Sequence, residues 1–160
     1  MNPQLQALFA QFHEAAAQAQ AQAKQDKWLL IDRVYEHMDE LATYPIDQLL
    51  AQILQLVETY PQLDYGGPGP FGSLIEEHLL ADYTPALAQS LQRQPSTQVI
   101  GWLDRAAQTE GMQLPCGPNP VSSEQYVQVL EQVLAHASAS QECKEFAQIC
   151  LTDARKFLER

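Results

Sequence analysis

A strongly periodic segment, IDQLLAQILQLVETYP at residues 46–61, sets the expected fold class. Its apolar side chains recur at three- and four-residue spacing, which places them on one face of an α-helix. Pro61 disfavours helical geometry at the residue before it, so the helix is predicted to end there. The side chains expected to face the core are Ile46, Leu49, Leu50, Ile53, Val57 and Tyr60.

The same periodicity recurs along most of the chain. The periodic segments lie at about residues 3–27, 28–42, 46–60, 70–79, 84–94, 96–106, 122–137 and 140–158. Their faces place Tyr35 and Phe157, among other apolar residues, toward the core. Leu, Ala, Gln and Glu dominate the composition, and these are good helix formers. Short links between segments favour antiparallel neighbours, so we predict an all-α protein of about eight helices. Residues 1–160 are expected to form a single domain, either a compact bundle or a short HEAT-like helical stack.

Short motifs predict local features of individual helices. Thr84 and Pro85 suit the N-cap and the first turn of one helix. Ser122 and Gln125 have the spacing of a capping box, in which each side chain bonds the backbone of the other residue. Gly101 interrupts a periodic segment, where glycine costs about 1 kcal/mol relative to alanine. Its presence indicates a close approach between two helices.

Residues 63–72, with the sequence LDYGGPGPFG, break the helical pattern. Glycine and proline at this density exclude a helix or a central strand and predict a structured turn. The composition is shared with phosphate-binding loops, but the Lys-Ser/Thr pair that follows such loops is missing. The prolines also lack the amide donors that those loops use. Nucleotide binding is therefore not expected, and Pro70 is predicted to start the next helix.

The charge balance limits the classes of partner. The chain has 20 acidic and 9 basic residues, a formal net charge of −11. This excess disfavours nucleic acid and anionic membrane surfaces, which require clustered Lys and Arg. It permits a basic protein partner through electrostatic attraction, although acidic charge also serves solubility alone. The start of the chain lacks signal-peptide features, and no stretch approaches the roughly 18 apolar residues of a membrane span, so a cytoplasmic location is expected.

Few residues have the spacing of a catalytic or metal-binding site. His78 and Asp82 share a helix face only if one helix continues through both, and two ligands alone make a poor metal site. Cys143 and Cys150 lie two turns apart on an apolar stripe and are expected to be packed core thiols. Cys116, between Pro and Gly, is the candidate for a reactive thiol. No catalytic, cofactor or metal site is predicted.

The segment from Leu63 to Ala107 resembles a group of small helical immunity proteins of bacterial polymorphic toxin systems. The matching residues are Asp64, Tyr65, Gly66, Pro68, Pro70, Glu76, Glu77, Tyr83, Ser90, Arg93 and Pro95, followed by a helix with Trp102, Leu103 and Arg105. Gly67 departs from the family pattern, which has a small polar residue there. The resemblance covers only this middle part of the chain, because the first helix and the last two helices have no counterpart.

The resemblance implies a non-catalytic inhibitor that neutralises a cognate bacterial toxin by direct binding. An acidic inhibitor suits a basic toxin domain, because opposite charges speed their encounter. Tyr65 and Tyr83 are expected to be exposed and to anchor the interface, since aromatic residues are enriched at binding hot spots. The acidic residues expected to contact the partner are Asp32, Glu36, Asp39, Glu40, Glu76, Glu77 and Asp82.

Two alternatives stay open at the level of sequence. The first is a helical scaffold or adaptor without a toxin partner, which self-associates in one version through its Ala- and Gln-rich helices. The second is an enzyme or metalloprotein that uses His78, Asp82 or Cys116.

Overall fold

The computed structural model describes residues 2–22, 26–108 and 117–159. Within these ranges the chain forms nine α-helices and no β-strand, which confirms the all-α prediction. None of these helices is long and apolar enough to cross a membrane. In chain order they are α1 (Pro3–Ala21), α2 (Trp28–Tyr35), α3 (Met38–Leu41), α4 (Ile46–Thr59), α5 (Gly69–Glu76), α6 (Leu80–Arg93), α7 (Thr97–Ala107), α8 (Ser123–Ala135) and α9 (Gln141–Leu158).

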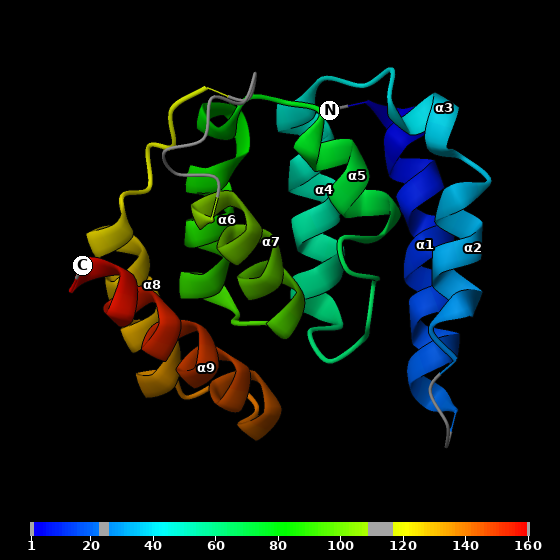
Figure 1. The fold of residues 1–160 in the computed structure, drawn as a ribbon. Helices are drawn as coiled ribbons and strands as arrows, with labels where there is room; N and C mark the ends of the chain where they lie inside the picture. The colour runs from blue at the N-terminus through cyan, green and yellow to red at the C-terminus, as the bar shows by residue number, and fades with distance from the viewer. Residues whose placement is uncertain (1, 23–25, 109–116, 160) are drawn as a thin grey trace.

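Eight of these helices form four pairs that stack in chain order (Figure 1). α1 packs against α2, α4 lies beside α5, α6 packs against α7, and α8 packs against α9. The first helices of successive pairs contact one another, α1 with α4, α4 with α6 and α6 with α8. On the other side of the stack, α2 contacts α5 and α7 contacts α9. Of the two predicted forms, the contacts match the helical stack.

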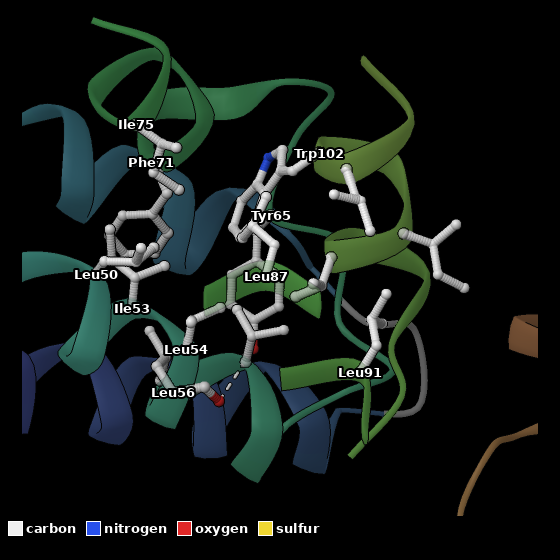
Figure 2. Close-up of a cluster of buried hydrophobic side chains, with 14 of the residues drawn as sticks. Leu50, Ile53, Leu54, Leu56, Tyr65, Phe71, Ile75, Leu87, Leu91 and Trp102 are labelled. Carbon is white, nitrogen blue, oxygen red and sulfur yellow. Dashed lines mark hydrogen bonds between the residues drawn. The ribbon is translucent and has the colours of Figure 1, made fainter. Parts of the chain in front are cut away.

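The hydrophobic core runs through the stack between the two layers of helices. Figure 2 shows its central part, which consists of Leu50, Ile53, Leu54 and Leu56 of α4, Phe71 and Ile75 of α5, Leu87 and Leu91 of α6, Trp102 of α7, and Tyr65. All of these side chains are buried. Each fully buried aliphatic or phenyl side chain contributes about 1.5–3 kcal/mol relative to an exposed one. The packing of successive pairs is therefore the main source of stability.

Three phenylalanines join the first helix pair to the second. Phe9 of α1 stacks on Phe71 of α5 with a centroid separation of 5.9 Å. Phe12 packs edge-on against both rings, at 5.1 Å from Phe9 and 6.0 Å from Phe71. Stacked and edge-on arrangements are the favourable geometries for aromatic pairs. The apolar stripe predicted for the first helix therefore faces α5 as well as its direct neighbours.

The helix start predicted at Thr84 and Pro85 is wrong. α6 begins at Leu80, so Pro85 lies inside the helix. An interior proline removes one backbone hydrogen bond and disfavours the helix by about 3 kcal/mol. Leu80 and Tyr83 are both buried, and their packing offsets this cost. The Thr84 hydroxyl donates a hydrogen bond to the Leu80 carbonyl at 2.9 Å, in place of the predicted cap.

The expected close approach at Gly101 is also wrong. A Cβ atom at Gly101 would meet no atom within 4 Å. The close approach lies instead at Gly72 of α5, where a Cβ would lie 2.6 Å from Pro68 Cβ and 2.8 Å from Trp102 Nε1. Gly72 therefore allows α5 to pack directly on the indole of α7.

The second periodic segment forms two helices rather than one. α2 ends at Tyr35 and α3 begins at Met38, with His37 between them outside helical geometry. The buried face of α2 is narrow, because only Leu30, Ile31 and Val34 are buried. Tyr35 lies at the edge of this face and exposes 54% of its surface, so its predicted inward orientation is wrong.

The two C-terminal helices begin as predicted. The Ser122 hydroxyl accepts from Gln125 N at 3.2 Å and Gln125 Oε1 accepts from Ser122 N at 2.9 Å, which confirms the capping box. The far end of α9 differs from the prediction. Leu151 is the last buried residue of α9, so the final turns extend beyond the core. Phe157 is therefore exposed rather than inward-facing.

Candidate functional site

Two large aromatic side chains are exposed on α2. Trp28 and Tyr35 each expose 54% of their surface. They lie seven residues apart, close to two full turns, so they share one side of the helix. Ile31 lies between them on the same side and is buried. Exposed aromatic residues on a well-packed helix are typical of a protein-binding surface.

A groove of about 310 Å³ lies beside these aromatic residues. We call it the α2 groove. Trp28, Ile31 and Tyr35 of α2 line one side, together with Lys27, the residue that precedes α2. Residues 66–70 and Ser73 form the other wall. The groove thus combines aromatic and aliphatic surface with the glycine- and proline-rich turn that interrupts the helical pattern.

Hydrogen bonds from α7 hold the turn in place. Gln98 Oε1 accepts from Tyr65 N at 3.0 Å, and its Nε2 donates to the Gly66 carbonyl at 2.7 Å. Trp102 Nε1 donates to the Pro68 carbonyl at 2.9 Å. Gly66 has a φ of +95°, which only glycine adopts without strain. The second wall of the α2 groove is therefore a fixed surface rather than an adaptable loop.

The prediction that Tyr65 and Tyr83 are exposed anchors is wrong. Tyr65 exposes 1% of its surface and lies in the central core, beside Trp102 (Figure 2). Its hydroxyl donates to the Tyr60 carbonyl at 2.8 Å, and burial raises the pKa of the phenol far above its usual value. Tyr83 is buried in α6. Both rings stabilise the fold, and neither is accessible to a partner.

Of the predicted acidic residues Asp32, Glu36, Asp39 and Glu40, the first two directly follow groove residues in the sequence, and none of the four lines the α2 groove. Asp32 is exposed on α2, four residues after Trp28, and Glu36 is exposed at the C-cap that follows Tyr35. Asp39, in the first turn of α3, is also exposed. Glu40 is exposed as well, but it interacts with neighbours on its own segment. Its Oε2 lies 3.7 Å from His37 Nδ1, and its Oε1 accepts from the Tyr44 hydroxyl at 3.4 Å.

The second predicted acidic group is not a continuous feature of one helix. Glu76 is the last residue of α5, and its carboxylate forms a bidentate ion pair with Arg105 of α7, at 2.5 and 3.1 Å. Glu77 follows in the link between helices, and Asp82 lies in the first turn of α6; both are exposed. Paired arginine–carboxylate contacts of this kind position helices. Glu76 therefore has a structural contact that competes with any role in partner binding.

A further ion-pair network joins α4 to α6. Glu58 accepts from Arg93 Nε at 2.9 Å, from Arg93 Nη2 at 3.0 Å and from the Ser90 hydroxyl at 3.1 Å. Ser90 and Arg93 are among the residues that carry the family resemblance, as are Trp102, Arg105 and the turn. These residues hold neighbouring helix pairs together. Sequence reasoning did not predict the roles of Glu58, which bonds Ser90 and Arg93, and Gln98, which bonds the turn. Nothing in the sequence distinguishes these two residues from ordinary surface residues.

The candidate chemical residues are not assembled into a site. α5 ends at Glu76 and α6 begins at Leu80, so His78 and Asp82 do not share a helix face. Among the described residues, no three His, Cys, Asp or Glu side chains could hold a metal ion. Cys143 and Cys150 are buried, as predicted, and burial raises the pKa of each thiol to about 11. Cys116 lies outside the described residues.

A larger hollow, of about 410 Å³, lies among α7, α8 and α9. Asp104 and Tyr126 contribute to it, and the Tyr126 hydroxyl donates to Asp104 Oδ1 at 2.6 Å. Because these polar groups bond each other, they serve the packing of α7 on α8. The α2 groove, with its two exposed aromatic rings, is the stronger candidate for a binding site.

No protein-family model, curated protein sequence or solved structure matches the chain.

Proposed function

We propose that the protein is a non-catalytic inhibitor that binds a cognate bacterial toxin, in the manner of an immunity protein, through the α2 groove. The observation that carries this proposal is the exposure of Trp28 and Tyr35 at the edge of the groove, beside the carboxylates of Asp32 and Glu36. Aromatic side chains supply most of the binding energy at many interfaces, and acidic neighbours favour a basic partner.

The rigidity of this surface supports its use in binding. Side chains of α2 fix it to the core, namely Leu30 and Val34, and α7 fixes the opposite wall through Gln98 and Trp102. A surface that is already ordered loses little conformational entropy when a partner binds. Truncation of a central interface aromatic typically costs about 2 kcal/mol or more of binding free energy. The net charge of −11 adds long-range attraction toward a basic toxin domain.

A second candidate function is a self-associating helical adaptor. The observation that favours it is the exposed apolar surface of α9, where Ile149 exposes 62% and Phe157 exposes 54%. In this case the interface lies at the opposite end of the stack from α2 (Figure 1). The two functions therefore predict sensitivity to substitutions in different helices.

Affinity purification from the cells of origin tests the proposal. We expect one basic protein to co-purify with the tagged wild-type chain at one-to-one stoichiometry, and to dissociate as salt is raised. Trp28→Ala with Tyr35→Ala should remove this protein, whereas Ile149→Ala, which truncates a similarly exposed apolar side chain, should retain it. Co-expression with the captured protein then tests neutralisation, because growth should be restored by wild type and not by the double variant.

The adaptor function predicts the reverse pattern. Ile149→Ala would then change the oligomeric state in light scattering, and the double variant in α2 would behave as wild type. That result would contradict the inhibitor proposal.

A further inference from the structure

We propose that the α2 groove receives an arginine or lysine side chain of the partner, and that Lys27 occupies this cation position in the free protein. This inference rests on the proposed function and specifies what the groove recognises. It follows from the way in which one side chain of the chain itself is seated at the groove.

Lys27 shows that the groove accommodates a cation. Its Nζ lies 3.3 Å from Asp64 Oδ2 and 5.3 Å from the centroid of the Trp28 ring. A cation is attracted by a carboxylate and by the face of an indole, and both are available here. Lys27 lines the α2 groove, and its ammonium lies between the Trp28 ring of α2 and Asp64 at the start of the turn.

Asp64 is held in position to receive a cation. Its Oδ1 accepts from Gly66 N at 2.8 Å, which fixes the carboxylate against the backbone of the turn. Its Oδ2 is the atom that faces Lys27. Because Gly66 is itself held by Gln98, the Asp64 carboxylate is fixed next to the second wall of the α2 groove, although Asp64 does not line the groove.

The Lys27 contact can be replaced at small cost. The side chains of Lys27 and Asp64 are 43% and 58% exposed, and exposed ion pairs contribute little to stability. An arginine suits the position better than a lysine, since its planar guanidinium stacks on an aromatic ring while it bonds a carboxylate. Its aliphatic stem would lie along the apolar surface between Trp28 and Tyr35. Asp32 and Glu36 add negative charge beside the same rings.

A peptide titration tests this without knowledge of the partner. The probe is acetyl-Gly-Arg-Gly-Arg-Gly-amide at low salt, and the control peptide carries Glu in place of Arg. Binding is followed by NMR at the indole N–H signals of Trp28, which is exposed, and Trp102, which is buried. We expect the arginine peptide alone to shift Trp28 and to leave Trp102 unchanged.

Variants of the two charged residues give opposite expected effects. Lys27→Ala removes the competing cation and should tighten peptide binding about threefold, whereas Asp64→Asn should weaken it about threefold or more. Ile149→Ala should bind as wild type. An unchanged Trp102 signal verifies the fold of each variant.

Two results would overturn the inference. One is peptide binding to Lys27→Ala that is equal to or weaker than wild type, and the other is a Trp28 shift that Asp64→Asn does not reduce. Either result leaves the proposed function standing if the α2 double variant still loses its co-purifying protein. Both the cation inference and the proposed function would be refuted by two results together. These are either of the peptide results above and a co-purifying protein that the Trp28→Ala/Tyr35→Ala variant still retains.

Discussion

At the scale of single residues, two glycines in contacting regions have opposite surroundings. Gly72 lies against Pro68 and Trp102, whereas Gly101 has open space where a side chain would begin. The same residue type therefore serves close packing in one helix and merely weakens the other. The periodic pattern pointed to Gly101, because a lone glycine in a helix is visible in the sequence while the closeness of α5 to α7 is not.

Gly72→Ala and Gly101→Ala form a matched pair of variants. Alanine at Gly72 would force Pro68 or the Trp102 indole to move, and we expect a loss of about 1–3 kcal/mol in the free energy of unfolding. Alanine at Gly101 meets no neighbour and improves helix propensity, so we expect a gain of up to about 1 kcal/mol. Urea unfolding followed by far-UV circular dichroism measures both, and equal effects of the two substitutions would contradict the packing described for α5.

The buried thiols predict how stability depends on pH. Burial raises the pKa of Cys143 and Cys150 from 9.0 to about 11, because a thiolate in the core would lose its hydration. Above pH 9 the unfolded chain releases protons that the folded chain retains, so this contribution to stability falls as pH rises from about 9 to about 11. Urea midpoints measured at pH 8 and pH 10.5 should differ less for Cys143→Ala/Cys150→Ala than for wild type. The same difference in both proteins would show that the thiols are not responsible.

At the scale of helices, one carboxylate adds polar contacts to the hydrophobic packing between α4 and α6. Glu58 accepts three hydrogen bonds from Ser90 and Arg93 and is only 19% exposed in its side chain. Glu131 offers a comparison, since it accepts one bond from Arg155 at 3.2 Å and is 49% exposed. The two carboxylates differ in the number of bonds and in solvent screening.

Glu58→Gln should therefore destabilise the protein by about 1–2 kcal/mol, because a neutral amide cannot receive the paired guanidinium donors. Glu131→Gln should change stability by less than about 0.5 kcal/mol, as is usual for exposed pairs. Thermal unfolding by calorimetry distinguishes the two. A similar loss in both variants would mean that helix contacts elsewhere dominate this part of the stack.

Sequence reasoning located helices better than it located surfaces. The capping box of Ser122 and Gln125 was predictable, since it consists of local spacing alone. The start of α6 was not, because the burial of Leu80 overrides the local preference of Pro85. Tyr35 lies at the border of an apolar stripe, where periodicity cannot decide between core and solvent. The α2 groove escaped prediction for this reason, although its acidic neighbours Asp32 and Glu36 were proposed.

At the scale of the whole molecule, the helix pairs contact mainly their neighbours in the stack (Figure 1). The α8–α9 pair forms one end and packs on α6 and α7 only on its inner side. Stability in such stacks is distributed as terms for each unit and for each junction between units. The central pairs, with contacts on two sides, are the most strongly held.

Native-state hydrogen exchange should reveal this gradient. We expect the amides of Cys150 and Leu151 in α9 to exchange roughly tenfold faster than those of Leu54 in α4 and Leu87 in α6, because end units open without the centre. Residue-resolved exchange by NMR measures this directly. Equal opening free energies in these three helices would instead indicate a single cooperative unit.

The dependence of the turn on α7 also has an evolutionary consequence. Gln98 and Trp102 hold Gly66 and Pro68 from a helix that contributes no wall to the α2 groove. A lineage that acquires a new specificity by remodelling the turn must alter its supports in α7 at the same time. Diverging homologues should therefore exchange residues 65–68 and residues 98–102 together, as one inherited block, while exposed positions of α2 outside the groove, such as Arg33, drift independently.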